Sequence, residues 1–156
     1  RICMLHKEIE RRFLLNPDYD LGSILNDVDE YEWEFIQDIY FNRNCRIRFS
    51  SLDGFLLTIK FGYGLIRTEF EIRVPGFIFR HLFNHNKSLC KSRCHLIYNG
   101  IKYALNDFLY DLVTIEVEFD DEIKANSISL PDWVGREVTN DRNFNGYYLF
   151  KSFLNK

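Results

Sequence analysis

Ile115-Glu116-Val117-Glu118-Phe119 alternates apolar residues with two carboxylates that stand two positions apart. Residues i and i+2 of a β-strand point to the same side of a sheet, so both glutamates would project from one face. Like charges at the same spacing recur in other strand-like stretches, namely Glu8/Glu10, Arg46/Arg48, Glu69/Glu71 and Lys91/Arg93. This repetition predicts a sheet with one charged face and one apolar face.

Each pair taken alone also fits the solvent face of an ordinary antiparallel strand, because that face is polar and water screens like charges there. Repetition favours a different interpretation, since an ordinary solvent face mixes in Thr, Ser and opposite charges. Carboxylates can hold a cation and basic groups can hold an anion. A divalent metal ion with a polyphosphate is a ligand that needs both.

Length and composition limit the class of protein. The 156 residues are expected to form a single domain, 1–156, with a substantial core. The aromatic content of 17 % and the presence of only three Pro are typical of an aromatic-rich β-protein. A net charge of −3 provides no general basic field for nucleic acid. The single Met is at position 4, so residues 1–3 are expected to be a cloning remnant or an upstream extension.

The sequence has no apolar run near the ~20 residues of a membrane span and no signal peptide, so no membrane partner and a cytoplasmic location are expected. The cysteines show neither a disulfide framework nor zinc-site spacing; they are Cys3, Cys45, Cys90 and Cys94. Cys90 and Cys94 are expected to be packed thiols on the strand face opposite Lys91 and Arg93. His81 and His85 are expected to form a surface pair.

Eight strands are expected, near 6–13, 33–41, 44–50, 55–62, 65–74, 89–98, 101–106 and 112–119. Asn99-Gly100 is a strong hairpin signal. Helices are expected after Pro17, from Pro75, and from about Asp141 to Phe153 with Thr139 or Asn140 as its cap. These elements fit an α+β, mainly β architecture. We expect a closed eight-stranded antiparallel barrel, a tunnel with its charged face inward and a few helices on its apolar face.

Seven motifs, in order along the chain, resemble those of the CYTH domain, the triphosphate tunnel metalloenzymes. The first, Glu8-Ile9-Glu10-Arg11-Arg12, is similar to the family's Glu-x-Glu-x-Lys, with Arg12 at the lysine position. The others are Cys45–Phe49 (Arg-x-Arg), Leu57–Lys60 (Thr-x-Lys), Arg67–Glu71 (Arg-x-Glu-x-Glu), Lys91–Arg93 (Lys-x-Arg), Ile115–Phe119 (Glu-x-Glu) and Leu130–Thr139 (Pro-x-Trp-hydrophobic-Gly-x-Glu-Val-Thr). The last of these is typical of the short bacterial members.

The resemblance implies a tunnel that hydrolyses triphosphates with Mg²⁺ or Mn²⁺. The positions that match metal ligands are Glu8, Glu10, Glu116 and Glu118. The positions that match substrate-binding residues are Arg12, Arg46, Arg48, Lys60, Lys91, Arg93, Glu69 and Glu71. Tyr40 resembles a tyrosine that accepts a proton in the family's Gln-x-Tyr-Leu strand, although the spacing differs by one residue. Tyr40, Arg12 and Lys60 are therefore the expected catalytic residues. Whether Asp107, displaced by one residue from the family's Asp-x-Phe, reaches the metal is left open.

Three functions remain open at this stage. The first is metal-dependent hydrolysis of the terminal phosphoanhydride of inorganic tripolyphosphate, a nucleoside triphosphate or both. The second is adenylate cyclisation or thiamine triphosphate hydrolysis, and either reaction needs an aromatic platform for the base or the thiamine ring. Trp33 and Trp133 do not recognisably form one, and both tryptophans are expected in the core or the barrel wall. The third is a non-catalytic polyphosphate-binding module. The expected partner is a small-molecule triphosphate, and the chain is expected to be a monomer or a homodimer.

Overall fold

A computed structural model describes residues 3–108 and 111–155. Within these ranges one sheet contains the strands β1 Cys3–Leu15, β2 Tyr31–Asn42, β3 Cys45–Ser50, β4 Gly54–Tyr63, β5 Ile66–Arg73, β6 Leu89–Tyr98, β7 Ile101–Phe108, β8 Leu112–Phe119 and β9 Val134–Glu137. The helices are α1 Leu21–Asn26, α2 Gly76–His85, α3 Glu122–Ser127, the 3₁₀ helix η1 Arg142–Phe144 and α4 Gly146–Leu154. None of the helices in these ranges is long and apolar enough to cross a membrane.

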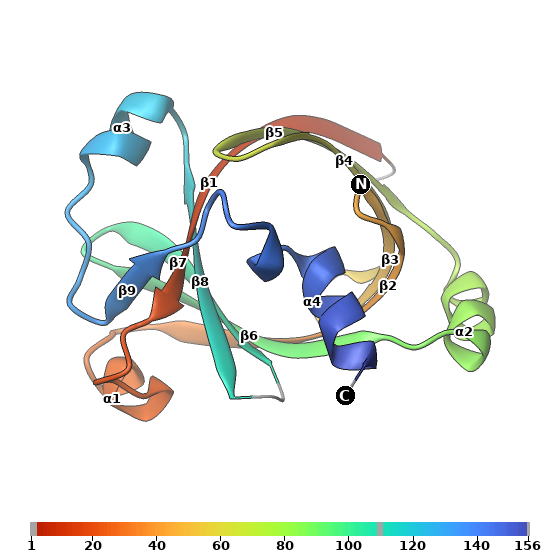
Figure 1. The fold of residues 1–156 in the computed structure, drawn as a ribbon, viewed down its shortest axis with the longest axis horizontal. Coiled ribbons are helices and arrows are strands. Elements are labelled where there is room, and N and C mark those ends of the chain that lie inside the picture. The colour runs from red at the N-terminus through yellow and green to blue at the C-terminus, as the bar shows by residue number, and fades with distance from the viewer. Residues whose placement is uncertain (1–2, 109–110, 156) are drawn as a thin grey trace.

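The first eight strands close into the predicted antiparallel barrel, which Figure 1 shows as a ring. Their order is β5-β4-β3-β2-β6-β7-β8-β1, and β1 closes the ring by pairing with β5. One long strand serves both neighbours: β1 pairs with β5 over residues 3–9 and with β8 over residues 9–14. Each of the eight predicted strand regions overlaps one of these strands. At the β6–β7 hairpin, Asn99 and Gly100 have the positive φ angles that the Asn-Gly signal requires.

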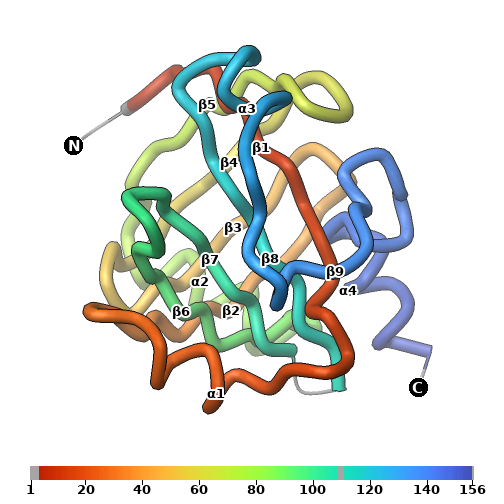
Figure 2. Tube along the Cα trace, turned by 90° about the vertical axis from the view of Figure 1, so that its left-hand side faces the viewer, coloured from red at the N-terminus to blue at the C-terminus, as the bar shows by residue number. Residues whose placement is uncertain are grey.

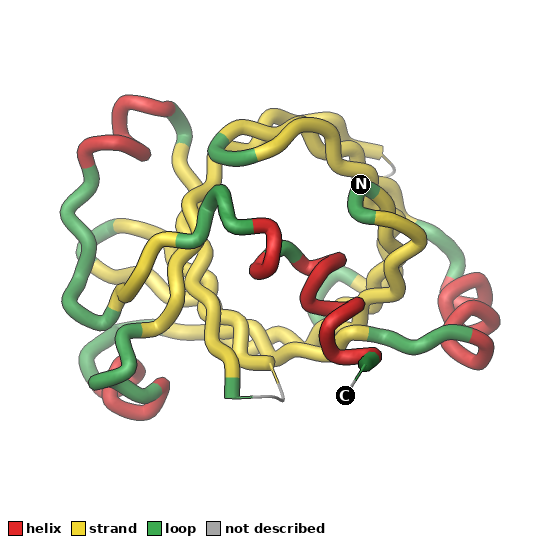
Figure 3. The backbone as a smooth tube through the Cα atoms, viewed as in Figure 1, coloured by secondary structure: helices red, strands yellow, loops and turns green. Residues whose placement is uncertain are grey.

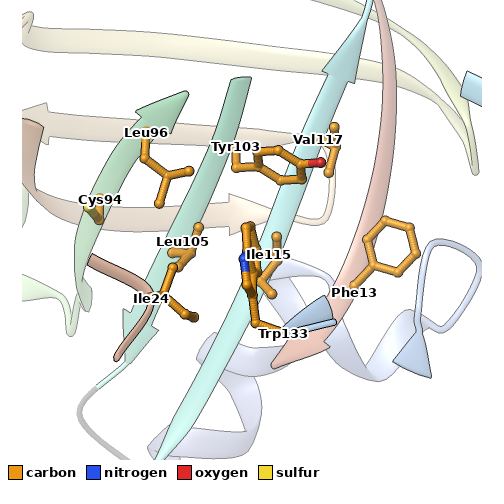
Figure 4. Packing of buried hydrophobic residues seen from close by; sticks show 9 residues of the cluster. All are labelled: Phe13, Ile24, Cys94, Leu96, Tyr103, Leu105, Ile115, Val117 and Trp133. Atoms are coloured by element: carbon orange, nitrogen blue, oxygen red, sulfur yellow. The ribbon is translucent and has the colours of Figure 1, made fainter. Parts of the chain in front are cut away.

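Most of the apolar core lies outside the ring, against the outer face of the barrel. Its largest cluster joins residues of β1, β6, β7 and β8 with α1 and the segment before β9; Figure 4 shows Ile24 and Trp133 among them. A second cluster places Phe79 of α2 against Ile39 and Ile47. Cys94 is fully buried in the first cluster, on the face opposite Lys91 and Arg93 as predicted. Burial raises the pKa of its thiol to about 11.

The third cluster closes one end of the barrel. There α4 packs Leu149 and Phe150 onto Phe108 and Leu89, and Figures 1 and 3 show η1 and α4 crossing the ring. The predicted helix from Asp141 to Phe153 is interrupted, because Asn145 has an extended backbone. The predicted caps Thr139 and Asn140 are wrong: Asp141 caps η1 and Asn145 caps α4 through their side-chain oxygens.

The sequence did not predict α3 or β9. Figure 2 shows the segment from α3 to β9 running along the outside of β1 and β8. Arg11 holds it there, because its Nη1 donates to the carbonyl of Ala125 at 2.8 Å and its Nε donates to Glu137 at 2.8 Å. Both elements are short, and β9 exists because it hydrogen-bonds to the edge of β1 that pairs with β5, beyond the residues that β5 covers.

Candidate functional site

A cavity of about 400 Å³ lies inside the barrel and is lined by residues from all eight barrel strands. η1 and α4 form its floor with Phe144, Gly146 and Leu149. A Cβ on Gly146 would overlap the Tyr40 hydroxyl, so the close approach of α4 requires glycine there. The sequence-predicted residues that line the cavity are Arg12, Tyr40, Arg46, Arg48, Lys60, Glu69, Glu71, Lys91, Arg93 and Glu116.

Three of the metal-ligand candidates are buried or nearly buried and lie in a continuous network of ion pairs with basic residues. They are Glu8, Glu10 and Glu116. Lys60 Nζ lies 3.3 Å from Glu8 and 2.9 Å from Glu69. Arg67 Nη2 joins Glu8 at 3.3 Å to Glu10 at 2.9 Å.

The network continues across the β1–β8 pair. Arg12 Nη2 lies 3.0 Å from Glu10 and 3.3 Å from Glu116, and Arg93 Nη2 lies 3.0 Å from Glu116. Glu118 stands directly opposite Glu10 in the β1–β8 register but is exposed. The structure therefore interleaves the carboxylates and the basic groups instead of separating them.

Burial would raise the pKa of Glu116, but Arg93 and Arg12 outweigh it and hold the pKa well below its usual range. Glu10 and Glu118 are not compensated in this way. Burial raises the pKa of Glu10, and the charge of Glu116 raises it further; burial and Glu8 raise the pKa of Glu118. A divalent cation would relieve this repulsion, and carboxylate oxygens are ligands that Mg²⁺ accepts. Within the described residues no three His, Cys, Asp or Glu side chains already form a metal-binding group. The donor set fits a divalent ion chemically, with Glu8, Glu10, Glu116 and Glu118 as the residues that would hold it.

Arg48 is fixed by a partner that the motifs did not reveal. Asp38, which is fully buried, accepts hydrogen bonds from Arg48 Nε at 2.7 Å and from Nη2 at 2.8 Å. Burial alone would raise the pKa of Asp38, but Arg48 and Arg46 outweigh it and hold the pKa well below its usual range. A bidentate arginine–carboxylate pair of this kind fixes the direction of the guanidinium.

Tyr40 lies inside the barrel, two residues from Asp38 and opposite Arg46 in the β2–β3 register. Its ring centroid is 5.7 Å from that of Phe150 on α4. Asp107 does not line the cavity: it pairs with Ser92 and Val113 on the outward-facing rows of β6 and β8. The buried Asn106 faces inward in its place and accepts a hydrogen bond from Arg93 Nε at 2.7 Å.

Two basic residues of the cavity have no ion pair within the described residues. Lys91 is 6 % exposed, and burial together with Arg93 and Arg48 pushes its pKa well below 10.5. Its Nζ lies 5.6 Å from the centroid of the Phe108 ring. Arg46 has a buried Nε without a hydrogen-bond partner. Burial would lower the pKa of Arg46, but the charges of Asp38, Tyr40 and Glu69 outweigh it and raise the pKa. Burying Lys91 without an ion pair is unfavourable, so an anion in the cavity would stabilise it.

A second unpredicted carboxylate stands toward the end of the barrel away from α4. Glu34 accepts a hydrogen bond from Ser50 Oγ at 2.5 Å and pairs with His95 Nε2 at 2.7 Å. Burial would raise the pKa of Glu34, but His95 and Ser50 outweigh it and lower the pKa to about 2. Glu32 lines the same end of the cavity. Sequence alone contained a signal here, because Glu32 and Glu34 have the same two-residue spacing as the predicted pairs.

The low pKa of Glu34 predicts acid sensitivity. Because its pKa of about 2 in the folded protein lies below the ordinary 4.5, its contribution is complete above pH 4.5 and is lost as pH falls toward 2. When the pH is lowered from about 5 to about 3, the free energy of unfolding should fall in both proteins. The fall should be about 1–2 kcal/mol smaller in Glu34→Gln than in the unmutated protein. Urea unfolding at both pH values measures this, with the exposed Glu30→Gln as control. Equal losses in all three proteins would contradict it.

The comparisons with known proteins agree with this architecture. No family model matches the sequence. The inorganic triphosphatase of Acetivibrio thermocellus is 27 % identical over an alignment 166 positions long, gaps included, that covers 94 % of each chain. The inorganic triphosphatase of Nitrosomonas europaea is 30 % identical over an alignment 152 positions long, gaps included, that covers 88 % of this chain and 92 % of the relative.

Solved structures give the same relationship. A crystal structure of an inorganic triphosphatase superposes with a TM-score of 0.64 at 25 % identity, over 91 % of this chain and 96 % of that one. A protein from Pyrococcus horikoshii, 18 % identical, shares the fold with a TM-score of 0.54 over 76 % of this chain and 82 % of its own. From its identity to the Nitrosomonas europaea relative over nearly its whole length, this chain belongs to the inorganic triphosphatase family.

Proposed function

We propose that this chain hydrolyses the terminal phosphoanhydride of a triphosphate inside the barrel, that inorganic tripolyphosphate is its substrate, and that it needs Mg²⁺ or Mn²⁺. We further assign it to the CYTH superfamily of tunnel enzymes. The observation that carries the proposal is the buried, unpaired Lys91, which faces a cavity of about 400 Å³ together with Arg12, Arg46, Arg48, Lys60 and Arg93. The names of the two curated relatives support the same activity.

Phosphoryl transfer depends mainly on positioning and on stabilising charge at the transferred group and the leaving group. Arg48, held by Asp38, and Lys91 bind phosphate oxygens from one side of the barrel. Arg12 and Lys60 bind them from the other side and already face carboxylates, so they bring the substrate next to the metal-ligand candidates. The bound metal ion would neutralise part of the phosphate charge and stabilise the departing pyrophosphate.

The residues at the floor of the cavity are placed to orient the attacking water molecule. The Tyr40 hydroxyl lies where Arg12, Arg46 and Gly146 meet, so it can orient a water molecule. Once its own proton has passed to solvent, the phenolate beside the two arginines could accept a proton from that water. η1 and α4 close this end of the barrel, because Arg12 Nη1 donates to the Phe144 carbonyl at 2.9 Å. Closure excludes bulk water and strengthens each charge interaction inside.

The metal requirement gives a prediction about Glu10 and Glu118. Glu10→Gln or Glu118→Gln should abolish metal-dependent hydrolysis while the protein stays folded, because each change removes a ligand charge and also relieves carboxylate repulsion. Calorimetric titration with Mn²⁺ should show weaker binding in both variants. Glu122→Gln, on the exposed surface of α3, is the control. Undiminished turnover of both variants at limiting Mg²⁺ would contradict the ligand assignment.

A phosphate-release assay with a substrate panel tests the activity itself. Tripolyphosphate, ATP and thiamine triphosphate are compared with and without Mg²⁺ or Mn²⁺, and tripolyphosphate with metal should give the highest rate. Neither tryptophan offers a platform for a base or thiamine ring, since Trp133 is buried in the outer core and Trp33 lies opposite Cys94 on the outer face. Faster hydrolysis of either organic substrate would overturn the assignment to tripolyphosphate.

A further inference from the structure

A second, smaller cavity lies beside the proposed active site, where the turn between β2 and β3 meets the start of α4. Its volume is about 40 Å³, several times the ~10–15 Å³ that a single water needs. Among the residues that the structure describes, no acidic side chain lines it and five basic ones do: Arg12, Arg43, Arg46, Lys60 and Arg67. Asn44 and Asn145 add amide groups.

The two cavities differ in whether carboxylates line them. The large cavity carries several carboxylates among its basic groups, including Glu34, Glu69 and Glu116, and so suits an anion that brings a metal ion. The small cavity has basic and amide side chains around it and suits a compact anion without a metal.

Three of the arginines that line the small cavity have a buried donor without a partner. Among the described residues, the buried Nε atoms of Arg12, Arg46 and Arg67 have no partner. Arg43 is exposed and makes no ion pair with any described residue. Unmet buried donors are uncommon in folded proteins and cost free energy, and the positive charge of the five lining residues would attract a compact anion.

The two cavities share a wall. Arg12, Tyr40, Arg46, Lys60 and Gly146 line both of them. A phosphoryl group that reacts against this wall is therefore next to the small cavity when the bond to pyrophosphate breaks. The volume suits a single phosphate far better than a chain of them.

We propose that the small cavity is an orthophosphate site, which takes the phosphate released from the terminal position while pyrophosphate still occupies the large cavity. The identification of this phosphate as product rests on the proposed function. The hydrolysis balances as one tripolyphosphate and one water giving one orthophosphate and one pyrophosphate, and the small cavity adds no covalent step. Arg43 lines the small cavity but not the large one, so a mutation of Arg43 can affect the first site without touching the second.

Calorimetric titration of inorganic phosphate into the protein saturated with pyrophosphate and Mg²⁺ tests this site. One phosphate should bind per chain, and Arg43→Gln should weaken its binding about three- to tenfold, since a charge-assisted bond from an exposed arginine is lost. Arg80→Gln, an exposed arginine on α2 that lines neither cavity, should bind as the unmutated protein does.

Two results would overturn the site: no phosphate binding once pyrophosphate is bound, or equal binding by Arg43→Gln and the unmutated protein. The titration requires no turnover, so it can fail or succeed independently of the substrate panel. A chain that hydrolyses no triphosphate but still binds phosphate in the Arg43-dependent way would retain the anion site and lose only its assignment to a product.

Discussion

Lys60→Ala is expected to lower kcat for tripolyphosphate about 100- to 1000-fold while raising KM far less. Lys60 Nζ lies between Glu8 at 3.3 Å and Glu69 at 2.9 Å and lines both cavities. In the proposed reaction it meets the charge that develops on the transferred phosphoryl group. An interaction made mainly in the transition state is lost from kcat, whereas one made equally with bound substrate is lost from KM. Steady-state kinetics separate the two effects.

Lys7→Ala is the matched control for this prediction. Lys7 stands on the same barrel, next to Glu8 in β1, but it faces outward and is exposed. Its removal should leave both constants unchanged. A Lys60→Ala enzyme with normal kcat and raised KM would reduce Lys60 to a substrate-binding residue, and Tyr40 and Arg12 would then have to carry the catalytic assignment.

Asp38→Ala should lower the free energy of unfolding by about 3–5 kcal/mol, because it leaves a buried guanidinium without its partner. Arg48 is 6 % exposed, and its neighbours Arg46 and Lys91 are themselves basic. Neither of them can replace the negative charge of Asp38. For a chain of this size the loss corresponds to a fall in Tm of roughly 6–20 °C. Urea and thermal unfolding at neutral pH measure it.

A double variant separates the ion pair from packing. Asp38→Ala combined with Arg48→Met removes both charges, and replacing both partners of a buried pair is far less costly than removing one. The double variant should therefore be more stable than Asp38→Ala alone. Asp29→Ala, at an exposed position, is the control. A loss below about 1 kcal/mol in Asp38→Ala, within the range of ordinary substitutions, would contradict this role.

The barrel and most of its lining follow from local alternation. A two-residue period fixes which side chains share a face, so Arg46, Arg48, Lys91 and Arg93 could be assigned to one surface before any strand was paired. The closed topology needed the further expectation that charged faces point inward. The lining of the cavity inside the barrel bears that out, because Arg46, Arg48, Lys91 and Arg93 all belong to it.

The unpredicted site residues depend on strand register. Asp38 has no like charge two positions away in β2, and only the pairing of β2 with β3 brings Arg48 beside it. Glu34 likewise depends on Ser50 of β3 and His95 of β6 for its hydrogen bonds. Patterns within one strand cannot reveal such partners. For the same reason Asn106, rather than Asp107, proved to be the inward residue of β7.

The C-terminal region shows a second limit of local patterns. The apolar spacing from Asp141 to Phe153 is helical throughout, but the chain has to turn across the end of the barrel within this stretch. Asn145 makes the turn with an extended backbone, and Gly146 then passes close to Tyr40. The break is set by contact with a distant strand, which a helical period does not encode.

³¹P NMR of tripolyphosphate incubated with the unmutated protein tests the central claim most directly. With Mg²⁺ or Mn²⁺, the signals of tripolyphosphate should decline while orthophosphate and pyrophosphate appear in equal amounts, and chelation of the metal should stop the reaction. The equal ratio identifies cleavage at the terminal phosphoanhydride. Tight binding of tripolyphosphate with no product above the buffer rate under any metal would contradict the account and leave a barrel that binds polyphosphate without hydrolysing it.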